Sequence, residues 1–168
     1  MNMAAQIGPP TAAIRAHEEL FAYWCSLKAD APAPPRRKID PAGMKRLLPT
    51  VSLIETPRVT GQDYRVRLAG TGLYSVYGRE ITGRSFSEVY NSAAADYWRS
   101  ELDKVVSERK PGVGVHSLSW RGASHLSIIW IRLPLATEGE DVGMILGYDA
   151  VVGLPAGAAA PTGIRPAA

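Results

Sequence analysis

The residues best suited to acid–base chemistry are four carboxylates that are spread along the chain, Glu80, Glu88, Asp96 and Asp149. A small α+β enzyme can use one buried carboxylate as its general acid or base. However, the chain carries no G-x-S-x-G, Walker A, H-E-x-x-H or paired-cysteine motif. We therefore expect most of these carboxylates to be helix caps or surface charges. We predict that the chain is not an enzyme, and a small acid/base enzyme is the alternative.

Metal chemistry would need histidines or cysteines at a ligand spacing. The three histidines are His17, on the apolar face of a predicted helix, and His116 and His125, on or beside predicted strands. They do not follow the spacing of any metal site. Cys25 is the single cysteine, so it forms no disulfide within the chain and no metal cluster by itself. We predict no metal site, and we expect a packed or hydrogen-bonded imidazole at His17.

Phosphate-binding chemistry is suggested only by GTGLYS, which begins at Gly70 after a predicted strand. Ser75 stands where a dinucleotide-binding loop has its third glycine, and no parallel βαβ unit follows. We interpret this segment as a tight turn that leads into a short helix. That helix carries Leu73, Val76 and Tyr77 and ends at Gly78.

The first element that must position these groups is a helix predicted from Thr11 to Lys28. Its apolar face can pack on the same domain or on a second copy of the chain. A proline-rich link, residues 29–39, separates it from the rest. The candidate dimerisation residues on this face are Ile14, Leu20, Phe21, Trp24 and Leu27.

The middle of the chain alternates helices and strands. Asp40-Pro41 predicts the start of a helix that continues to Leu48, and two strands follow, TVSLIE and a segment that begins at Tyr64. A long helix is predicted from residue 91 or 92 to 110, with Trp98 pointing inward and Arg99 paired with Asp103.

Three strands are predicted near the end of the chain, at 112–120, 125–135 and 142–152. The central one is apolar on both faces, with Leu126, Ile128 and Trp130 opposite Ile129, Ile131 and Leu133, so both of its faces should be covered. The fold class is therefore α+β. A five-stranded antiparallel sheet has the middle helices on one face, and the N-terminal helix covers either the other face or a dimer partner.

Composition agrees with one globular domain over residues 11–152. The chain has 168 residues, 46% apolar, and both ends, 1–10 and 153–168, are rich in Ala, Pro and Gly and are predicted to be disordered. It has no secretory leader and no apolar run long enough for a membrane, so we predict a cytoplasmic protein with no membrane contact. The net charge is +3, and the basic cluster from Arg36 to Arg46 indicates a solvated surface rather than nucleic-acid binding.

This order of elements, together with YGREITGRSFSEV, resembles a PAS domain. More narrowly, three segments are similar to a proteobacterial family of single-domain PAS-like proteins: LFAYWCSLKADAPAPPRRKIDPAGMKRLLPTVSLIE, DYRVRLAGTGLYSVYGREITGRSF and MILGYDAVV. The resemblance covers about residues 15 to 152. It implies a sensory or protein-interaction module, and it does not imply a particular ligand.

The resemblance also implies where a cofactor would be bound. Light-sensing flavin PAS domains carry a cysteine on the middle helices, whereas Cys25 is on the first helix. Haem PAS domains place a histidine on or near the long helix, and residues 91–110 contain none. We therefore expect no cofactor, neither haem nor flavin.

If the chain binds a small molecule, the site should lie between the middle helices and the sheet, where this fold leaves internal volume. Such a ligand would be hydrophobic or of mixed polarity, although aromatic side chains alone can fill the space. The candidate ligand-binding residues are Tyr74, Tyr77, Phe86, Trp98 and Trp130.

The favoured function is a stand-alone sensory or regulatory module that acts by dimerisation or by binding an unknown signalling protein. We expect a homodimer. The alternatives are a small-molecule or haem sensor with the same fold, and the small acid/base enzyme.

Overall fold

The computed structural model describes residues 7–154 and 157–158. The helices are α1 (Pro10–Lys28), α2 (Leu73–Tyr77), α3 (Phe86–Val89) and α4 (Ser92–Glu108). The strands are β1 (Val51–Glu55), β2 (Arg65–Ala69), β3 (Gly112–Leu118), β4 (Ala123–Glu138) and β5 (Asp141–Val152). Short 3₁₀ turns are η2 (Arg36–Lys38), η3 (Pro41–Met44), η4 (Leu48–Thr50) and η5 (Ser119–Arg121).

The five strands form one antiparallel sheet in the order β2-β1-β5-β4-β3. The two longest strands, β4 and β5, are joined by a tight hairpin and lie in the middle of the sheet. Each of them has a neighbour on both sides, so their side chains can be buried on both faces. The predicted α+β class with a five-stranded antiparallel sheet is confirmed.

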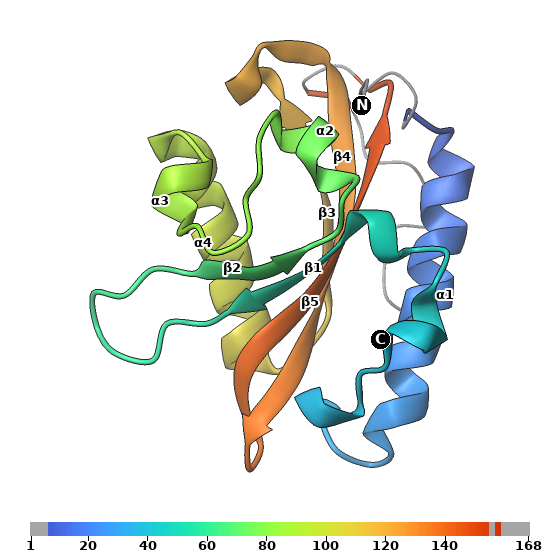
Figure 1. The fold of residues 1–168 in the computed structure, drawn as a ribbon, viewed down its shortest axis with the longest axis vertical. Helices are drawn as coiled ribbons and strands as arrows, with labels where there is room; N and C mark the ends of the chain where they lie inside the picture. The colour runs from blue at the N-terminus through green and yellow to red at the C-terminus, as the bar shows by residue number, and fades with distance from the viewer. Residues whose placement is uncertain (1–6, 155–156, 159–168) are drawn as a thin grey trace.

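Helices cover the two faces of the sheet differently (Figure 1). One long helix, α1, lies across one face, and α2, α3 and α4 lie on the other. On β4 the alternation is as predicted. Ile131 and Leu133 belong to the core beneath α1, whereas Ile128 and Trp130 belong to the core beneath the other helices.

The predicted dimerisation residues on α1 divide into two groups. Leu20 and Trp24 are completely or almost completely buried against the sheet of the same chain. The Trp24 indole Nε1 donates a hydrogen bond of 2.8 Å to the Pro134 carbonyl, which anchors the helix. These two residues were wrongly predicted as dimer contacts, because their own sheet already covers them. Ile14, Phe21 and Leu27 are only partly buried.

The segment after Asp40 was predicted as a helix through Leu48, and this is wrong. Asp40 caps Ala42 as predicted, but only two separate 3₁₀ turns follow, η3 and η4. The backbone at Gly43 packs so closely against Tyr23 of α1 that a Cβ at this position would lie 2.3 Å from the ring. Close packing on α1 therefore shapes this segment more than its helical spacing does.

Strand β2 also departs from simple alternation. Leu53 pairs with Leu68, but Ile54 pairs with Val66, so the strand has one extra residue at Arg67. Such a bulge moves the following side chain to the other face. Leu68, which strict alternation would place on the same face as Val66, is consequently 50% exposed.

The contacts of α4 and of the N-terminus complete the fold. Arg99 was expected to pair with Asp103 on the same helix, but it binds Asp63, and Asp103 accepts a hydrogen bond from Tyr64.

Gly8 donates to the Val151 carbonyl at 3.0 Å, so the predicted disordered segment 1–10 is wrong for residues 7–10. Residues 1–6 and most of the predicted tail 153–168 lie outside the described residues.

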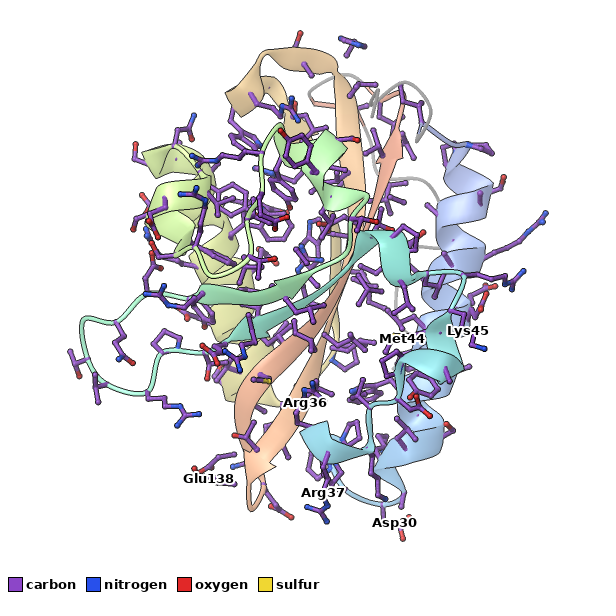
Figure 2. The ribbon with its side chains drawn as sticks, viewed as in Figure 1. Asp30, Arg36, Arg37, Met44, Lys45 and Glu138 are labelled. Carbon is purple, nitrogen blue, oxygen red and sulfur yellow. The ribbon has the colours of Figure 1, made fainter. Side chains whose placement is uncertain are left out.

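Two surface properties follow from this arrangement. In the described part of the chain, no helix combines the length and the apolar character that crossing a membrane requires. Figure 2 shows that Arg37 and Lys45 lie at separate positions, and Asp30 and Glu138 are acidic side chains at the same end of the molecule as Arg37. Arg46 is paired with Glu19 at 2.8 Å. The basic cluster of the sequence does not become one uninterrupted basic surface.

Candidate functional site

A buried ion pair lies on the face of the sheet that the helices α2, α3 and α4 cover. Arg132 of β4 and Asp149 of β5 approach to 2.8 Å between Nη2 and Oδ1, and each is 1% exposed. Burial works to lower the pKa of Arg132, but the nearby charge of Asp149 raises it above the ordinary value. The arginine therefore stays charged, and the carboxylate of Asp149 is its counter-ion.

Two tyrosines extend the ion pair toward the helices. The hydroxyl of Tyr77, the last residue of α2, donates to Asp149 Oδ2 at 3.0 Å. The hydroxyl of Tyr90 donates in turn to that of Tyr77 at 3.1 Å. Burial and the charge of Asp149 raise the pKa of both phenols, so both remain neutral donors. We call Arg132, Asp149, Tyr77 and Tyr90 the polar cluster.

Tryptophans surround the guanidinium of the polar cluster. Arg132 Cζ lies 4.6 Å from the ring centre of Trp98 and 5.7 Å from that of Trp130. A cation held over aromatic faces in a water-free interior gains electrostatic stabilisation from each ring. The Trp130 indole Nε1 donates to the Tyr97 hydroxyl at 3.0 Å, which fixes the orientation of that ring.

Glycines make room for these large side chains. A Cβ at Gly114, which pairs with Trp130 across the strands, would lie 2.7 Å from the Trp130 ring. A Cβ at Gly147, which pairs with Arg132, would lie 3.1 Å from Arg132 Nη1. The alternating glycines of GVGV and the single glycine of MILGYDA therefore belong to the site, although they carry no functional group.

The polar cluster reaches through the sheet toward α1. Arg132 Nη1 donates to the carbonyl of Tyr148 at 3.2 Å. The Tyr148 ring belongs to the opposite face and packs edge-on against His17 of α1, with the ring centres 5.8 Å apart. Burial lowers the pKa of His17 to about 4, so its imidazole is neutral at pH 7. A short chain of contacts thus joins the two layers of helices.

The predicted ligand-binding residues are partly brought together. Tyr77, Phe86, Trp98 and Trp130 are all buried in the core between the helices and the sheet. Tyr74 is 53% exposed and was wrongly placed there, because α2 has only five residues and turns this side chain outward. Whether the other four contact a ligand stays a prediction.

The other residues singled out from the sequence have ordinary surroundings. Glu88 completes a capping box with Ser85, Glu80 accepts from the Thr82 amide, and Asp96 is paired with Arg99. Cys25 and His17 are on α1, away from the helices α2 to α4. In the described ranges, no three His, Cys, Asp or Glu side chains converge as a metal site would require.

Sequence reasoning missed Arg132, Tyr90 and Tyr97, and it did not rank Asp149 above the other carboxylates. The sequences of β4 and β5 each contain a feature that indicates Arg132 and Asp149. Arg132 is the only charged residue in IIWIRLPL, and Asp149 interrupts the apolar run of β5. A single charge within a strand that is buried on both faces calls for a partner. Their pairing depends on the β4–β5 register, in which Arg132 faces Gly147 and Trp130 faces Asp149.

Comparisons with known proteins agree with this architecture. A family model described as PAS domain matches residues 13–149. No protein of curated function matches the chain closely enough to count as a relative.

Similar solved structures share the fold at low sequence identity. An RNA-binding light-oxygen-voltage receptor is 14% identical, with a TM-score of 0.50 over 71% of this chain and 36% of that chain. A fungal LOV domain photoreceptor is 16% identical, with a TM-score of 0.48 over 78% and 87% of the two chains. The PAS domain of a protein from Colwellia psychrerythraea is 12% identical, with a TM-score of 0.47 over 65% and 93%.

Proposed function

Because the chain belongs to the PAS domain family, we propose that it is a sensory module in which the polar cluster controls how firmly α1 is held on the sheet. The match to the PAS domain family confirms the PAS-like fold that was predicted from the sequence. A protein partner would bind α1 according to how firmly this helix is held on the sheet. The membership in a narrower proteobacterial family of single-domain proteins and the cytoplasmic location stay predictions.

The observation that carries this proposal is the buried pair of Arg132 and Asp149. A buried ion pair adds little net stability compared with apolar side chains of the same volume, because both charges lose their hydration. We infer that a pair in this place has another role, and its position supports one. Arg132 contacts Trp98 of α4 on one side of the sheet. It also donates to the backbone of Tyr148, whose ring packs against α1 on the other side. A change at the tyrosines would alter both sets of contacts.

Hydrogen exchange tests the coupling with a matched pair of variants. Tyr77→Phe removes the hydroxyl that binds Asp149, and Tyr64→Phe removes a similar hydroxyl that binds Asp103, farther from the cluster. We expect faster exchange of the α1 amides in Tyr77→Phe and unchanged exchange of these amides in Tyr64→Phe. Equal rates for α1 in the two variants would refute the coupling.

The partner that we propose is a second copy of the chain, bound along α1. Ile14, Phe21 and Leu27 pack against the core of their own chain but are only partly buried, so each leaves apolar surface accessible. Phe21→Glu would place a charge in this contact and should convert a dimer into a monomer, as measured by light scattering, with Ser100→Glu, at an exposed position of α4 on the other face of the sheet, as the control. A wild-type chain that is monomeric at high concentration contradicts this part of the proposal.

We also propose that the chain is neither an enzyme nor a haem or flavin protein. The carboxylate of Asp149 is 1% exposed and is engaged by Arg132 and Tyr77, so a substrate cannot reach it in this arrangement. Cys25 lies on the α1 side of the sheet, and His125 is exposed. An absorption spectrum of freshly purified protein tests the cofactor part, because bound haem or flavin would absorb visible light.

A further inference from the structure

One edge of the sheet presents basic and apolar side chains to solvent. Strand β2 is this edge strand, and Arg65, Arg67 and Leu68 are exposed along it. In Figure 1, β2 and the hairpin that joins it to β1 extend away from α1. The outer side of β2 is already paired at Val66, whose amide donates to the Arg84 carbonyl at 2.9 Å. A partner would therefore contact the side chains of β2 rather than add a strand beside Val66.

The bulge at Arg67 determines which way these side chains face. Leu68 pairs with Leu53, which belongs to the core beneath α1, so Leu68 lies on the α1 side of the sheet. It is nevertheless 50% exposed, because α1 does not cover this edge. Arg67 Nε lies 3.9 Å from Glu55 Oε1, and Glu55 faces the side opposite to Ile54, which belongs to the other core. Arg67 and Leu68 therefore place a cation and an apolar group on the same surface.

The free charges of this surface are mainly positive. Arg67 is largely exposed, and the guanidinium of Arg58, in the adjoining hairpin, makes no hydrogen bond or ion pair with any described residue. The carboxylate of Asp63 is already neutralised by Arg99, through two hydrogen bonds of 2.9 Å. Glu55 is the remaining carboxylate beside these arginines, and it cannot balance both of them. The surface thus lacks a negative partner.

A pocket of about 170 Å³ lies at the hairpin end of this surface. Its described lining residues are Glu55, Thr56, Arg58, Gln62, Asp63 and Arg65. Arg65 Nη1 donates to the Gly83 carbonyl at 2.6 Å, which holds this side chain in place. A guanidinium can bind a carboxylate through two parallel hydrogen bonds. The pocket is therefore suited to a carboxylate, with the unpaired Arg58 as the group that receives it.

We propose that β2 and its hairpin bind an extended acidic segment of a partner protein. One carboxylate binds at Arg58 and Arg65, a second binds Arg67, and an apolar side chain packs on Leu68. Side chains of an extended segment that face the same way lie two residues apart, so the segment has the pattern Glu-x-Glu-x-Leu. Single-stranded nucleic acid is disfavoured, because the described residues of this surface include no exposed aromatic ring for base stacking. This inference goes beyond the proposed contact along α1.

Three capped peptides separate the chemical requirements. The peptide ETETLT carries all three groups, QTQTLT lacks the carboxylates, and ETETST lacks the apolar side chain. Two-dimensional proton–nitrogen NMR follows the backbone amide signals of β2. We expect ETETLT to shift these signals saturably, with a dissociation constant on the order of 0.1–1 mM at low salt. QTQTLT should bind about tenfold more weakly or worse, and added salt should weaken the binding of ETETLT because it screens exposed charges.

Two matched double variants locate the binding site. Arg58→Gln with Arg67→Gln removes two exposed positive charges from the surface, and we expect it to weaken ETETLT binding about tenfold or more. Arg37→Gln with Lys45→Gln removes two exposed positive charges elsewhere, and should leave binding nearly unchanged. Figure 2 shows Arg37 and Lys45 away from β2. Leu68→Thr should make the protein bind ETETLT and ETETST equally. All five positions are exposed, so we expect each variant to fold.

Each other result would overturn the proposed partner. Equal binding of ETETLT and QTQTLT, or equal losses in the two double variants, would show that this surface does not recognise carboxylates. Tighter binding of a thymidine oligonucleotide than of ETETLT would assign the surface to nucleic acid. A wild-type dimer that Arg58→Gln with Arg67→Gln converts into a monomer would assign it to a second copy of the chain. None of these results depends on whether Tyr77→Phe changes the exchange of α1, so the sensory proposal is tested separately.

Discussion

Each face of the sheet buries a core of its own, but the two cores differ in chemistry. Beneath α1 the core is made mainly of aliphatic residues, with Leu20, Leu133 and Leu146 at its centre. Beneath α2, α3 and α4 the core is aromatic and encloses a charged pair. An aliphatic core holds a helix in place without requiring one exact arrangement, whereas a charged pair must keep its partners. We infer that the first face secures α1 and that the second face is where the state of the module can change.

The largest effect should come from breaking the ion pair on the aromatic face. Asp149→Leu leaves the charge of Arg132 buried without its partner, and we expect a loss of about 3–5 kcal/mol in the free energy of unfolding. The double variant Arg132→Met with Asp149→Leu should recover most of this loss, because no charge remains buried. Urea denaturation measures both. A double variant as unstable as the single one would contradict our account of the pair.

A smaller loss is expected on the aliphatic face. Leu20 is fully buried between α1 and the sheet. Leu20→Ala should lower the free energy of unfolding by about 3 kcal/mol, through lost burial and the cavity left behind. The same change should speed hydrogen exchange in α1, and because coupling between two sites is reciprocal, it should also reduce the near-ultraviolet circular dichroism of the aromatic face. Faster α1 exchange with an unchanged aromatic signal would contradict the coupling of the two faces.

Acid should weaken the attachment of α1 through His17. Its folded pKa of about 4 is below the ordinary 6.5, so the unfolded chain binds more protons between these values, and stability falls as the pH falls through this range. We expect His17 to account for a loss of about 2 kcal/mol between pH 7 and pH 5, because each pKa unit corresponds to about 1.4 kcal/mol.

Burial dominates the shift of the His17 pKa; the Ile129 backbone and the charge of Asp149 oppose it, and the charge of Arg132 adds to it, both charges acting from the other face of the sheet, while the Tyr148 ring packs on the imidazole. His116, whose pKa is also lowered by burial, adds to the same trend from the aromatic face. His17→Gln should therefore reduce the pH dependence without abolishing it. Denaturation curves at pH 5 and pH 7 compare the two proteins, and an unchanged slope would show that His17 does not titrate in this way.

The smallest of these effects concerns the room left for Trp130. A Cβ at Gly114 would lie within 3 Å of its buried ring, so Gly114→Ala should destabilise the protein by at least about 1 kcal/mol. Gly153→Ala is the matched control, because no atom lies within 4 Å of its added Cβ. Thermal unfolding of the two variants gives the comparison, and equal midpoints would show that the Trp130 ring can shift without cost.

Much of the fold was predictable because the local patterns agree with the packing. The two-sided apolar pattern of β4 predicted a strand with both faces covered, and Gly78, at positive φ, ends the short helix as predicted. Predictions failed where a distant contact outweighed a local one. The segment after Asp40 had helical spacing but packs on Tyr23, and Leu68 had the right period but follows a bulge.

The candidate site was less predictable, because its members come from four separate parts of the chain. The aromatic residues Phe86, Trp98 and Trp130 were placed correctly in the core by their spacing alone. Tyr74 was not, because a five-residue helix is too short for periodicity to decide which side faces inward. Arg58 and Arg65 line one pocket only because the hairpin between β1 and β2 brings them together.

By itself, the sequence determined the five strands, the two long helices α1 and α4, and the covering of β4 on both faces, since these depend on neighbouring residues and their alternation. Only the tertiary structure decided that α1 of the same chain provides one of the covers and that Arg132 meets Asp149. Both outcomes depend on the register of strands and on the path of a long link, and these are set by packing between residues far apart in the chain.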